Sequence, residues 1–347
     1  MKHFASSIIV TLIGLSAAYY WAGFPGLSVA FLLGLMEVSL SFDNAIVDAA
    51  ILKNMNAQWQ RRFLTWGMLF AVFGVRMLLP LMIVSLTSGL SLPEVAHMAV
   101  QHPDLYAHHI EQSHMQISAF GGMYLLMVFF SFFFRTTKSV HWLRWLEKRL
   151  SRLGKLESIE VALALGILMG AQYFLPQESR LPVLLSGVIG VVIFVIVKSA
   201  SKIVEDSESP QKVANQGFSA FVYLEILDLS FSLDGVIGAF AITQDIVIIL
   251  IGLIMGAMVV RNFTLFLVRR SALDEFLFLE HGAHYAIGAL SLLMLYTLFA
   301  EVSEFITGTL GMSIMLLSLW SSIRHRKQMQ PQPPPIAKAV ARVKSRK

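Results

Sequence analysis

The sequence predicts an all-α polytopic membrane helix bundle of about ten spans, with an inverted repeat of about three spans. The first observation is composition: 56% of the 347 residues are hydrophobic and only 14% are charged, whereas soluble domains carry roughly 25% charged residues. The second is that the apolar residues form runs about 20 long, the length that a helix needs to cross a bilayer. The third is a pattern of acids and serines that occurs twice inside such runs.

The expected spans are apolar segments of sufficient length. In chain order they are residues 4–22, 27–52, 62–86, 116–134, 157–175, 181–200, 217–242, 245–268, 283–300 and 304–322. With the N-terminus inside, 24 of the 27 Lys and Arg residues fall on the inner side and only Arg180 falls outside. Cytoplasmic loops are enriched in Lys and Arg, so both termini are expected in the cytoplasm. Lys2 and the apolar run after it also resemble a signal peptide, but no clear small-residue cleavage site follows.

These spans divide the chain into five parts. They are a leading span (1–26), a first repeat half (27–134), a basic cytoplasmic segment with two linking spans (135–216), a second repeat half with the last span (217–323), and a disordered basic cytoplasmic tail (324–347). Within the third part, residues 142–158 are basic and amphipathic with two tryptophans. That pattern predicts a helix lying on the cytoplasmic leaflet.

The repeated pattern places carboxylates in apolar surroundings. The first copy is EVSLSFDNAI at residues 37–46, and the second is DLSFSLDGVI at residues 228–237. Both read acid, apolar, Ser, apolar, Ser, apolar, Asp, Asn or Gly, apolar, Ile. A carboxylate in hydrocarbon is costly, so acids kept inside spans are functional candidates. The alternative is that these residues only join helices through hydrogen bonds, a role that the serines alone would serve.

The similarity continues into the next span of each half. Gly67 and Arg76 follow the first motif nine residues apart, and Gly252 and Arg261 follow the second with the same separation. The motifs lie in the second and seventh expected spans, so an odd number of crossings separates them and they run in opposite directions. An inverted repeat with its site near the midplane is a recurring secondary-transporter design.

The motif acids, together with one amide, form an oxygen-rich set of candidate metal ligands. The set comprises Glu37, Asp43, Asn44, Asp228 and Asp234, with Glu225 three residues before Asp228. Oxygen ligands suit hard ions such as Mn²⁺ and Mg²⁺, and the absence of cysteine disfavours thiolate-bound Cu⁺ or Zn²⁺. On a regular helix Glu37 and Asp43 point roughly 120° apart, so one shared ion requires a broken helix or two adjacent subsites. Glu225 is either a further ligand or proton carrier, or a protonated carboxyl bonded to a neighbour.

The motifs EVSLSFDNA and E-x-x-D-L-S-F-S-L-D-G resemble those of the TerC family of integral membrane proteins, over most of residues 27–300. The chain is most similar to a longer, poorly characterised bacterial branch. The resemblance implies an inner-membrane exporter of manganese or another divalent metal, associated with tellurium resistance. It implies metal-binding roles for the family's acidic positions, which here are Glu37, Asp43, Glu225, Asp228 and Asp234. One departure is Gly235, which stands where the first motif has an amide.

Other polar residues in or near the spans have open interpretations. Asp48 is interpreted as an ordinary helix-end acid. Arg76 and Arg261 are either counter-ions to the empty acid site or structural residues that snorkel to the interface. The histidines of the outside connection 87–115 form either an auxiliary metal site or a solvated loop. His281 and His284, at the cytoplasmic mouth of the ninth span, are possible vestibule ligands or proton-handling groups.

No nucleotide-binding loop, nucleophile elbow or metalloprotease motif is present. We therefore expect no enzyme, no ATP-driven pump by this chain alone, no tightly bound cofactor and no nucleic-acid partner. The expected partners are the lipid bilayer, a transported divalent ion with Mn²⁺ favoured, and protons; the oligomeric state is open. Two other classes remain: an intramembrane hydrolase in which Asp43 and Asp234 share a proton, and a non-transporting scaffold in a metal or tellurite stress complex.

Overall fold

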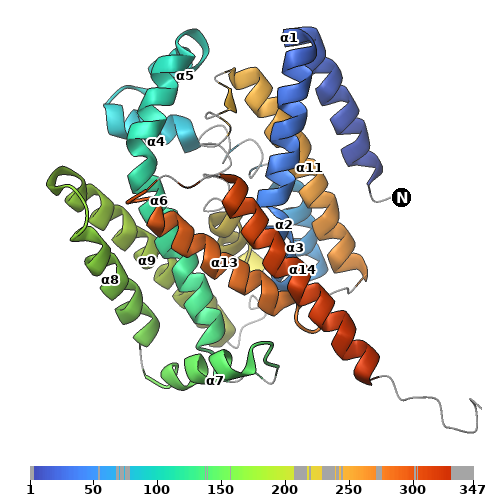
Figure 1. The fold of residues 1–347 in the computed structure, drawn as a ribbon, viewed down its shortest axis with the longest axis vertical. Coiled ribbons are helices and arrows are strands. Elements are labelled where there is room, and N and C mark those ends of the chain that lie inside the picture. The colour runs from blue at the N-terminus through green and yellow to red at the C-terminus, as the bar shows by residue number, and fades with distance from the viewer. Residues whose placement is uncertain are drawn as a thin grey trace, which may run out of the picture.

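A computed structural model describes residues 4–53, 55–67, 70, 74, 79–136, 138, 140–156, 158–206, 217–218, 220–228, 239, 242–243, 245–270, 276–300, 302 and 304–329. Throughout these ranges every regular element is a helix (Figure 1). The prediction of an all-α protein is confirmed for this part of the chain.

The described helices follow one another in a single order along the chain. They are α1 (Ala5–Leu40), α2 (Phe42–Leu52), α3 (Ala57–Arg62), the π-helical turn η1 (Phe63–Gly67), α4 (Leu79–Ser88), α5 (Leu92–Gln101), α6 (Pro103–Phe133), α7 (Arg144–Leu153), α8 (Ile159–Gln172), α9 (Gln177–Asp206), α11 (Ile246–Arg270), α13 (Leu279–Tyr296) and α14 (Glu304–Met329).

α1 consists of two arms folded into a hairpin (Figure 1). Gly23 between the arms has φ 66°, a left-handed value that favours glycine, and Pro25 follows where the second arm begins. Trp21 donates a hydrogen bond of 3.0 Å to Asp245, whose carboxylate also accepts from two N–H groups in the first turn of α11. The helix break therefore lies between the first two expected spans, and it is tied to the start of α11.

α6 is the central helix of a second group, in which it packs against α9, α13, α4, α5 and α8. Its side chains Tyr124 and Phe133 are fully buried, and Phe194 of α9 packs edge-on against Tyr124. α13 joins this group through a hydrogen bond from Ser291 Oγ to the Gly122 carbonyl. α1 and α11 pack against each other and form the first group. α2 contacts α11 of this group and α13 of the second, so the first motif lies where the two groups meet.

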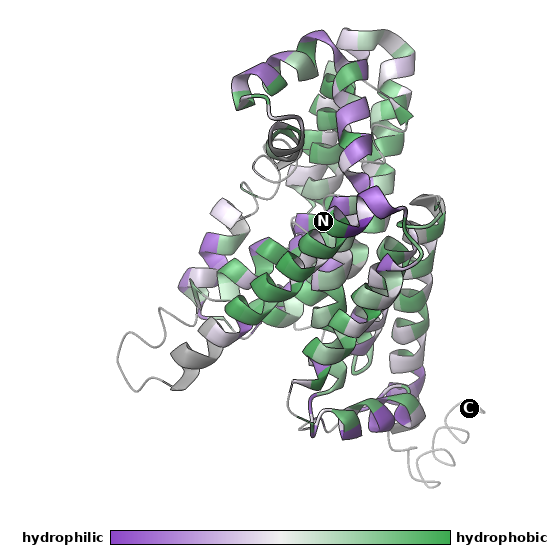
Figure 2. Ribbon diagram, turned by 90° about the vertical axis from the view of Figure 1, so that its left-hand side faces the viewer, coloured by the Kyte–Doolittle hydropathy of each residue, from purple (hydrophilic) through white to green (hydrophobic). Residues whose placement is uncertain are grey.

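The outer surface supports a membrane location. Four described helices are long and apolar enough to cross a membrane: Ala5–Leu40, Pro103–Phe133, Gln177–Ser199 and Ile246–Arg269. Large apolar side chains stay exposed along α1 and α9, among them Tyr20 (93%), Leu181 (63%) and Ile196 (61%). Green apolar ribbon dominates the middle of the molecule in Figure 2. Soluble proteins rarely expose such continuous apolar surface, so the chain is a membrane protein.

The count of ten spans and the inverted repeat stay predictions. The expected spans 62–86 and 217–242 include residues outside the described ranges.

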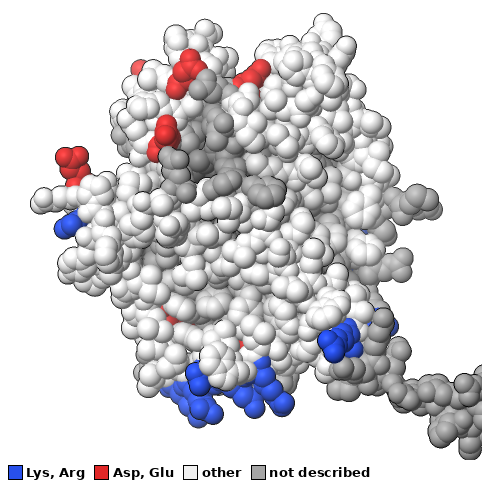
Figure 3. Space-filling model, in the orientation of Figure 1, with Lys and Arg blue, Asp and Glu red and all other residues white. Residues whose placement is uncertain are grey.

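Charged side chains gather at opposite ends of the molecule. On the face drawn in Figure 3, Lys and Arg side chains cover the end that holds α7, and Asp and Glu side chains lie at the end that holds α5. The expected cytoplasmic segment 135–157 and the expected outside connection 87–115 thus lie at opposite ends. The orientation of these ends in a membrane remains a prediction.

Two segments are more helical than the sequence indicated. The connection 87–115, for which a solvated loop was one interpretation, contains α5 and the first turns of α6. α5 begins with a capping box in which Ser91 and Glu94 satisfy each other's backbone N–H groups, and α6 begins with Pro103, which suits the first turn of a helix. At the other end of the chain, α14 continues through residues 324–329 of the expected tail.

Candidate functional site

The first motif lies on a helix that is interrupted in its middle. α1 ends at Leu40, Ser41 has φ −99° and ψ 11°, and α2 begins at Phe42. The interruption is a kink, because the Ser41 N–H still donates to the Glu37 carbonyl at 2.9 Å and the Ala45 N–H donates to the Ser41 carbonyl at a longer 3.3 Å. The helix is therefore kinked at the first motif, and the unwinding with freed carbonyls that was expected of a broken helix is not seen at Ser41.

Four buried polar residues follow one another across this kink. Glu37, Ser41, Asn44 and Asp48 have side chains that are 1%, 6%, 2% and 4% exposed. Their spacing of four, three and four residues places them along one helix face, and we call them the polar stripe. Ser41 Oγ donates a 2.8 Å hydrogen bond to Glu37 Oε1. A serine of the motif is thus hydrogen-bonded to the first motif acid.

Asp48 corrects an interpretation made from the sequence. It was expected to be an ordinary helix-end acid, but it is only 4% exposed and is therefore buried in the bundle. Its position four residues after Asn44 was the available signal, since it extends the same helix face. Asp48 therefore joins the candidate site residues.

Glu37 lies directly against α11. A Cβ placed on Gly256 of α11 would lie 2.5 Å from Glu37 Cβ and 2.6 Å from its Cγ. One turn away, a Cβ on Gly34 would lie 3.3 Å from the Gly252 carbonyl oxygen. Glycines at these positions let the two helices approach closely, as small residues do between membrane helices. The acid is consequently held in a narrow helix interface.

Glu225 lies just before the second motif and is also buried. Residues 220–228 are helical, Glu225 is 7% exposed, and Asp228 is half-buried. A Cβ on Gly67, in η1, would overlap Glu225 Oε1, so the carboxylate lies on the bare backbone of that turn. Neither Glu225 carboxylate oxygen has a hydrogen-bond partner among the described residues. A buried carboxylate of this kind is costly unless it holds a proton or a cation.

The remaining motif acids cannot be placed in the same way. Asp43 belongs to α2, but its side chain, like Asp234 and the paired arginine Arg76, lies outside what the structure describes. Among the described residues, no three His, Asp or Glu side chains come together as a metal-binding group. The described part of the site therefore consists of the polar stripe on one side and of Glu225 and Asp228 on the other.

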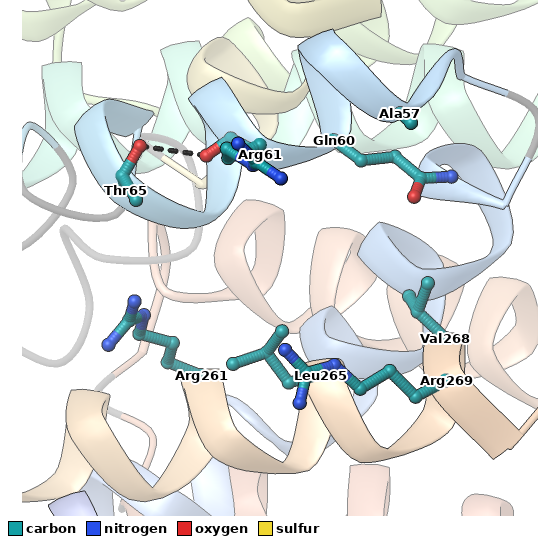
Figure 4. A pocket seen from close by; sticks show the side chains of 8 residues that line it. All are labelled: Ala57, Gln60, Arg61, Thr65, Arg261, Leu265, Val268 and Arg269. Atoms are coloured by element: carbon teal, nitrogen blue, oxygen red, sulfur yellow. Dashed lines mark hydrogen bonds between the residues drawn. The ribbon is translucent and has the colours of Figure 1, made fainter.

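Arg261 follows Gly252 in the second repeat half by nine residues, as Arg76 follows Gly67 in the first. It lines a pocket together with Arg61 and Arg269 (Figure 4). Arg261 thus lies on α11 near other cations, at a pocket that α11 shares with the α3–η1 segment. Both interpretations of Arg261, a counter-ion to the acids and a structural residue that snorkels to the interface, stay predictions.

The two histidines near the basic end have structural partners. His281 Nδ1 lies 3.1 Å from both carboxylate oxygens of Glu147, a residue of α7 that the sequence did not single out and that is 1% exposed. The N–H groups of Trp142 and Leu143 also donate to Glu147. His284 stacks on Phe132, with ring centroids 3.6 Å apart. These contacts dock α7 against α13 and make a vestibule role for His281 and His284 less favoured.

The histidines of the acidic end lie on α5 and α6, except His102, which lies between the two helices. His108 pairs with Gln112 at 3.0 Å within α6, and its ring centroid lies 6.5 Å from that of His109. No group of three possible ligands forms there among the described residues. The auxiliary metal site therefore gains no support from the described geometry.

Comparison with known proteins gives one match. The model of a family described as "Protein of unknown function (DUF475)" matches residues 42–329. No curated protein and no solved structure matches the chain. The matched range includes Asp43, Asn44 and Asp48 of the first motif helix and the whole second motif, but it begins after Glu37. The TerC resemblance is not named by this match and stays a prediction from the motifs.

Proposed function

The chain belongs to the family described as "Protein of unknown function (DUF475)", and from this premise we propose that it is an integral membrane transporter that exports a divalent metal ion, with Mn²⁺ favoured. The exit of the metal is coupled to proton entry. In this proposal the chain lies in a bacterial inner membrane with both termini in the cytoplasm, and the TerC resemblance of the motifs supplies the direction of transport and the association with tellurium resistance.

The burial of acids inside apolar helices is the observation that carries the proposal. Glu37, from the first motif, is 1% exposed, and Glu225, next to the second motif, is 7% exposed. α1, which contains Glu37, is apolar enough to cross a membrane. Carboxylates buried at membrane depth typically belong to ion or proton pathways. Two such acids, one from each half, favour a site shared between the halves.

A pair of equivalent contacts supports the inverted repeat. Aligning Glu37 with Asp228 makes Gly34 equivalent to Glu225, and the glycine pair Gly67 and Gly252 is equivalent as well. Gly34 packs on Gly252, and Glu225 packs on Gly67. Each motif helix therefore touches the same position of the other half's second helix, as two halves related by a pseudo-two-fold axis would do.

The proposed ligands are oxygen atoms. They come from Glu37, Asp43, Asn44, Glu225, Asp228 and Asp234, to which Asp48 is added. The Ser41 carbonyl, which accepts a long hydrogen bond of 3.3 Å from the Ala45 N–H, has a second lone pair that could face an ion. Hard divalent ions favour such oxygen sets. Because clustered carboxylates repel one another, the empty site should hold protons that metal entry releases.

The test is flux in proteoliposomes that contain the purified chain. Mn²⁺ flux should follow an imposed pH gradient and should compete with protons. Zn²⁺ binds most protein sites more tightly than Mn²⁺ does, but its flux relative to that of Mn²⁺ should be lower than this order of affinities implies. Flux that ignores pH would contradict proton coupling. Specific transport of Zn²⁺ with Mn²⁺ excluded would contradict the ligand argument.

Single substitutions separate the site from the scaffold. Asp43→Asn and Asp234→Asn should each abolish Mn²⁺ flux with little loss of folded protein, because they remove a ligand charge and keep its shape. Asp48→Asn should also lower flux. Glu178→Gln, at an exposed position in the first turn of α9, is the matched control and should leave flux unchanged. Normal flux in both Asp variants would exclude the motif acids as the transport site.

A further inference from the structure

A buried amine lies in the connection between α6 and α7, away from the motif acids. It belongs to Lys138, whose Nζ is inaccessible to water and has no hydrogen-bond partner among the described residues. Nζ lies 3.1 Å from the centre of the Phe132 ring and 4.4 Å from that of Phe133, both near the end of α6. Aromatic faces attract a cation, but they replace only part of the hydration that a buried charge loses.

Charged and titratable groups from three parts of the chain surround this amine and the nearby carboxylate of Glu147. Glu147 accepts hydrogen bonds from the N–H groups of Trp142 and Leu143 and lies 3.1 Å from His281 Nδ1. No hydrogen bond joins it to Lys138 in the described structure, so it acts on the amine through its charge. The surrounding groups are Arg135 in the connection, Glu147 on α7, and Glu280, His281, His284 and Tyr285 on α13.

The balance of these effects opposes a proton on the docked amine. Burial lowers the pKa of Lys138 from 10.5 to about 7; the charges of Glu147 and Glu280 raise this pKa, and that of Arg135 lowers it, but burial has the largest effect. A lysine in water keeps its proton up to about pH 10. The amine therefore prefers to be neutral when it lies against Phe132 and Phe133, and charged when it is in water.

We propose that Lys138 is a pH-sensitive switch, in which the neutral amine docks the α6–α7 connection on Phe132 and Phe133 and the protonated amine releases it into water. The charge of the amine thereby controls how firmly α7, which begins at Arg144, is held against α13. The proposal does not depend on metal transport, because none of these residues belongs to the motifs.

The direction of the pH dependence follows from proton linkage. The pKa of Lys138 is lower in the docked connection than in water, so the released connection binds more protons. Docking therefore has its full contribution from Lys138 above about pH 10.5 and loses it as the pH falls to about 7. Below about pH 7 the amine is charged in both states, and this contribution no longer changes.

Hydrogen exchange in the detergent-purified full chain provides the test. The reporters are the amides of Trp142 and Leu143, which donate to Glu147 in the docked connection. Lys138→Met keeps an apolar chain and cannot be charged, and comparing it with the unchanged protein at the same pH cancels the intrinsic pH dependence of exchange. It should exchange more slowly than the unchanged protein at pH 7, and this ratio of rates should shrink about five- to tenfold for each pH unit between 7 and 9.

Two further variants separate charge from packing. Lys138→Arg stays charged over this range, so it should exchange faster than the unchanged protein, increasingly as the pH rises. Lys148→Met, at an exposed position on α7, is the matched control and should give a ratio near one at every pH. A ratio for Lys138→Met that does not vary with pH, or faster exchange in Lys138→Met at pH 7, would refute the switch.

A titration of the unchanged protein tests the same inference without any variant. When the lysine side-chain signals are followed by NMR, one lysine should titrate near pH 7. If every lysine titrates near pH 10, then the amine of Lys138 is not buried as a neutral group and the proposal is wrong.

Discussion

Replacing Gly256 by alanine tests the closest helix approach at the candidate site. The added Cβ would lie 2.5 Å from Glu37 Cβ, 2.6 Å from Glu37 Cγ and 2.8 Å from the Gly34 carbonyl oxygen. Carbon atoms in favourable contact lie about 3.5–4.0 Å apart, so α1 and α11 must separate by about 1 Å at this level. Two of the three atoms belong to the rigid parts of α1, so a rotamer change of Glu37 does not remove the overlap.

The expected cost follows from that displacement. Overpacking a tight interface by one methyl group costs about 1–3 kcal/mol, and it is only partly offset by the helix propensity of alanine, up to about 1 kcal/mol. Gly256→Ala should therefore lower the free energy of unfolding by about 1–2 kcal/mol. It should also reduce Mn²⁺ flux strongly, because Glu37 is moved away from the other ligands.

The assay compares two glycines in helices. Unfolding in detergent is followed by circular dichroism for Gly256→Ala and for Gly166→Ala, since a Cβ on Gly166 of α8 would meet no atom within 4 Å. Gly166→Ala should be neutral or stabilising. If both variants unfold alike and both retain normal flux, then α1 and α11 are not in close contact at Glu37, and the argument for a packed acid there is wrong.

Two further predictions concern topology and the basic end. A single cysteine at Ser139 should be protected from an impermeant thiol reagent in intact spheroplasts, because Ser139 belongs to the expected cytoplasmic segment 135–157; labelling there would overturn the topology. Burial raises the pKa of Glu147. The hydrogen bond and charge of His281, the hydrogen bond from the Leu143 N–H and the charge of Lys138 lower this pKa by more than burial raises it, so the pKa lies below 4.5. This carboxylate contributes stability that is present above about pH 4.5 and is lost as the pH falls through its lowered pKa. Glu147→Gln should therefore loosen α7 at pH 7, measured as faster hydrogen exchange than in the unchanged protein at the same pH, and the difference should shrink as the pH falls through the lowered pKa; a difference that is the same at every pH would show that the charge is not what holds α7.

The features predicted correctly from the sequence depend on local pattern. Run length and composition indicated membrane helices, and the break between the first two spans follows from Gly23 and Pro25, which act locally. The basic amphipathic segment 142–158 contains α7, as its charge pattern predicted. Spacing along one helix face also placed Glu37 and Asn44 together, and both are buried.

Features that depend on distant partners were missed. Glu147 lies in a strongly basic helix, and local pattern would leave it in solvent, but it accepts from His281, which is 134 residues further along the chain. Asp48 looked like a helix-end acid because its burial depends on how α2 packs against α11 and α13. In the connection 87–115, the polar histidines concealed a helix start that the Ser91 and Glu94 capping box encodes.

The two halves of the expected repeat differ at one position that bears on the proposed proton coupling: the first half has Gly34 where the second has Glu225. Gly67 and Gly252 are recognisable as a pair in the sequence, but only their contacts show that each receives the opposite motif helix: Gly252 meets the backbone at Gly34, and Gly67 meets the carboxylate of Glu225. Glu225 therefore has no acidic counterpart in the first half. In transporters with inverted repeats, rocking of one repeat against the other opens the site to alternate sides. An acid that exists in only one half has no equivalent in the other half during that exchange, so, if the proposed transport is correct, Glu225 is the proposed ligand best suited to carry a proton as well.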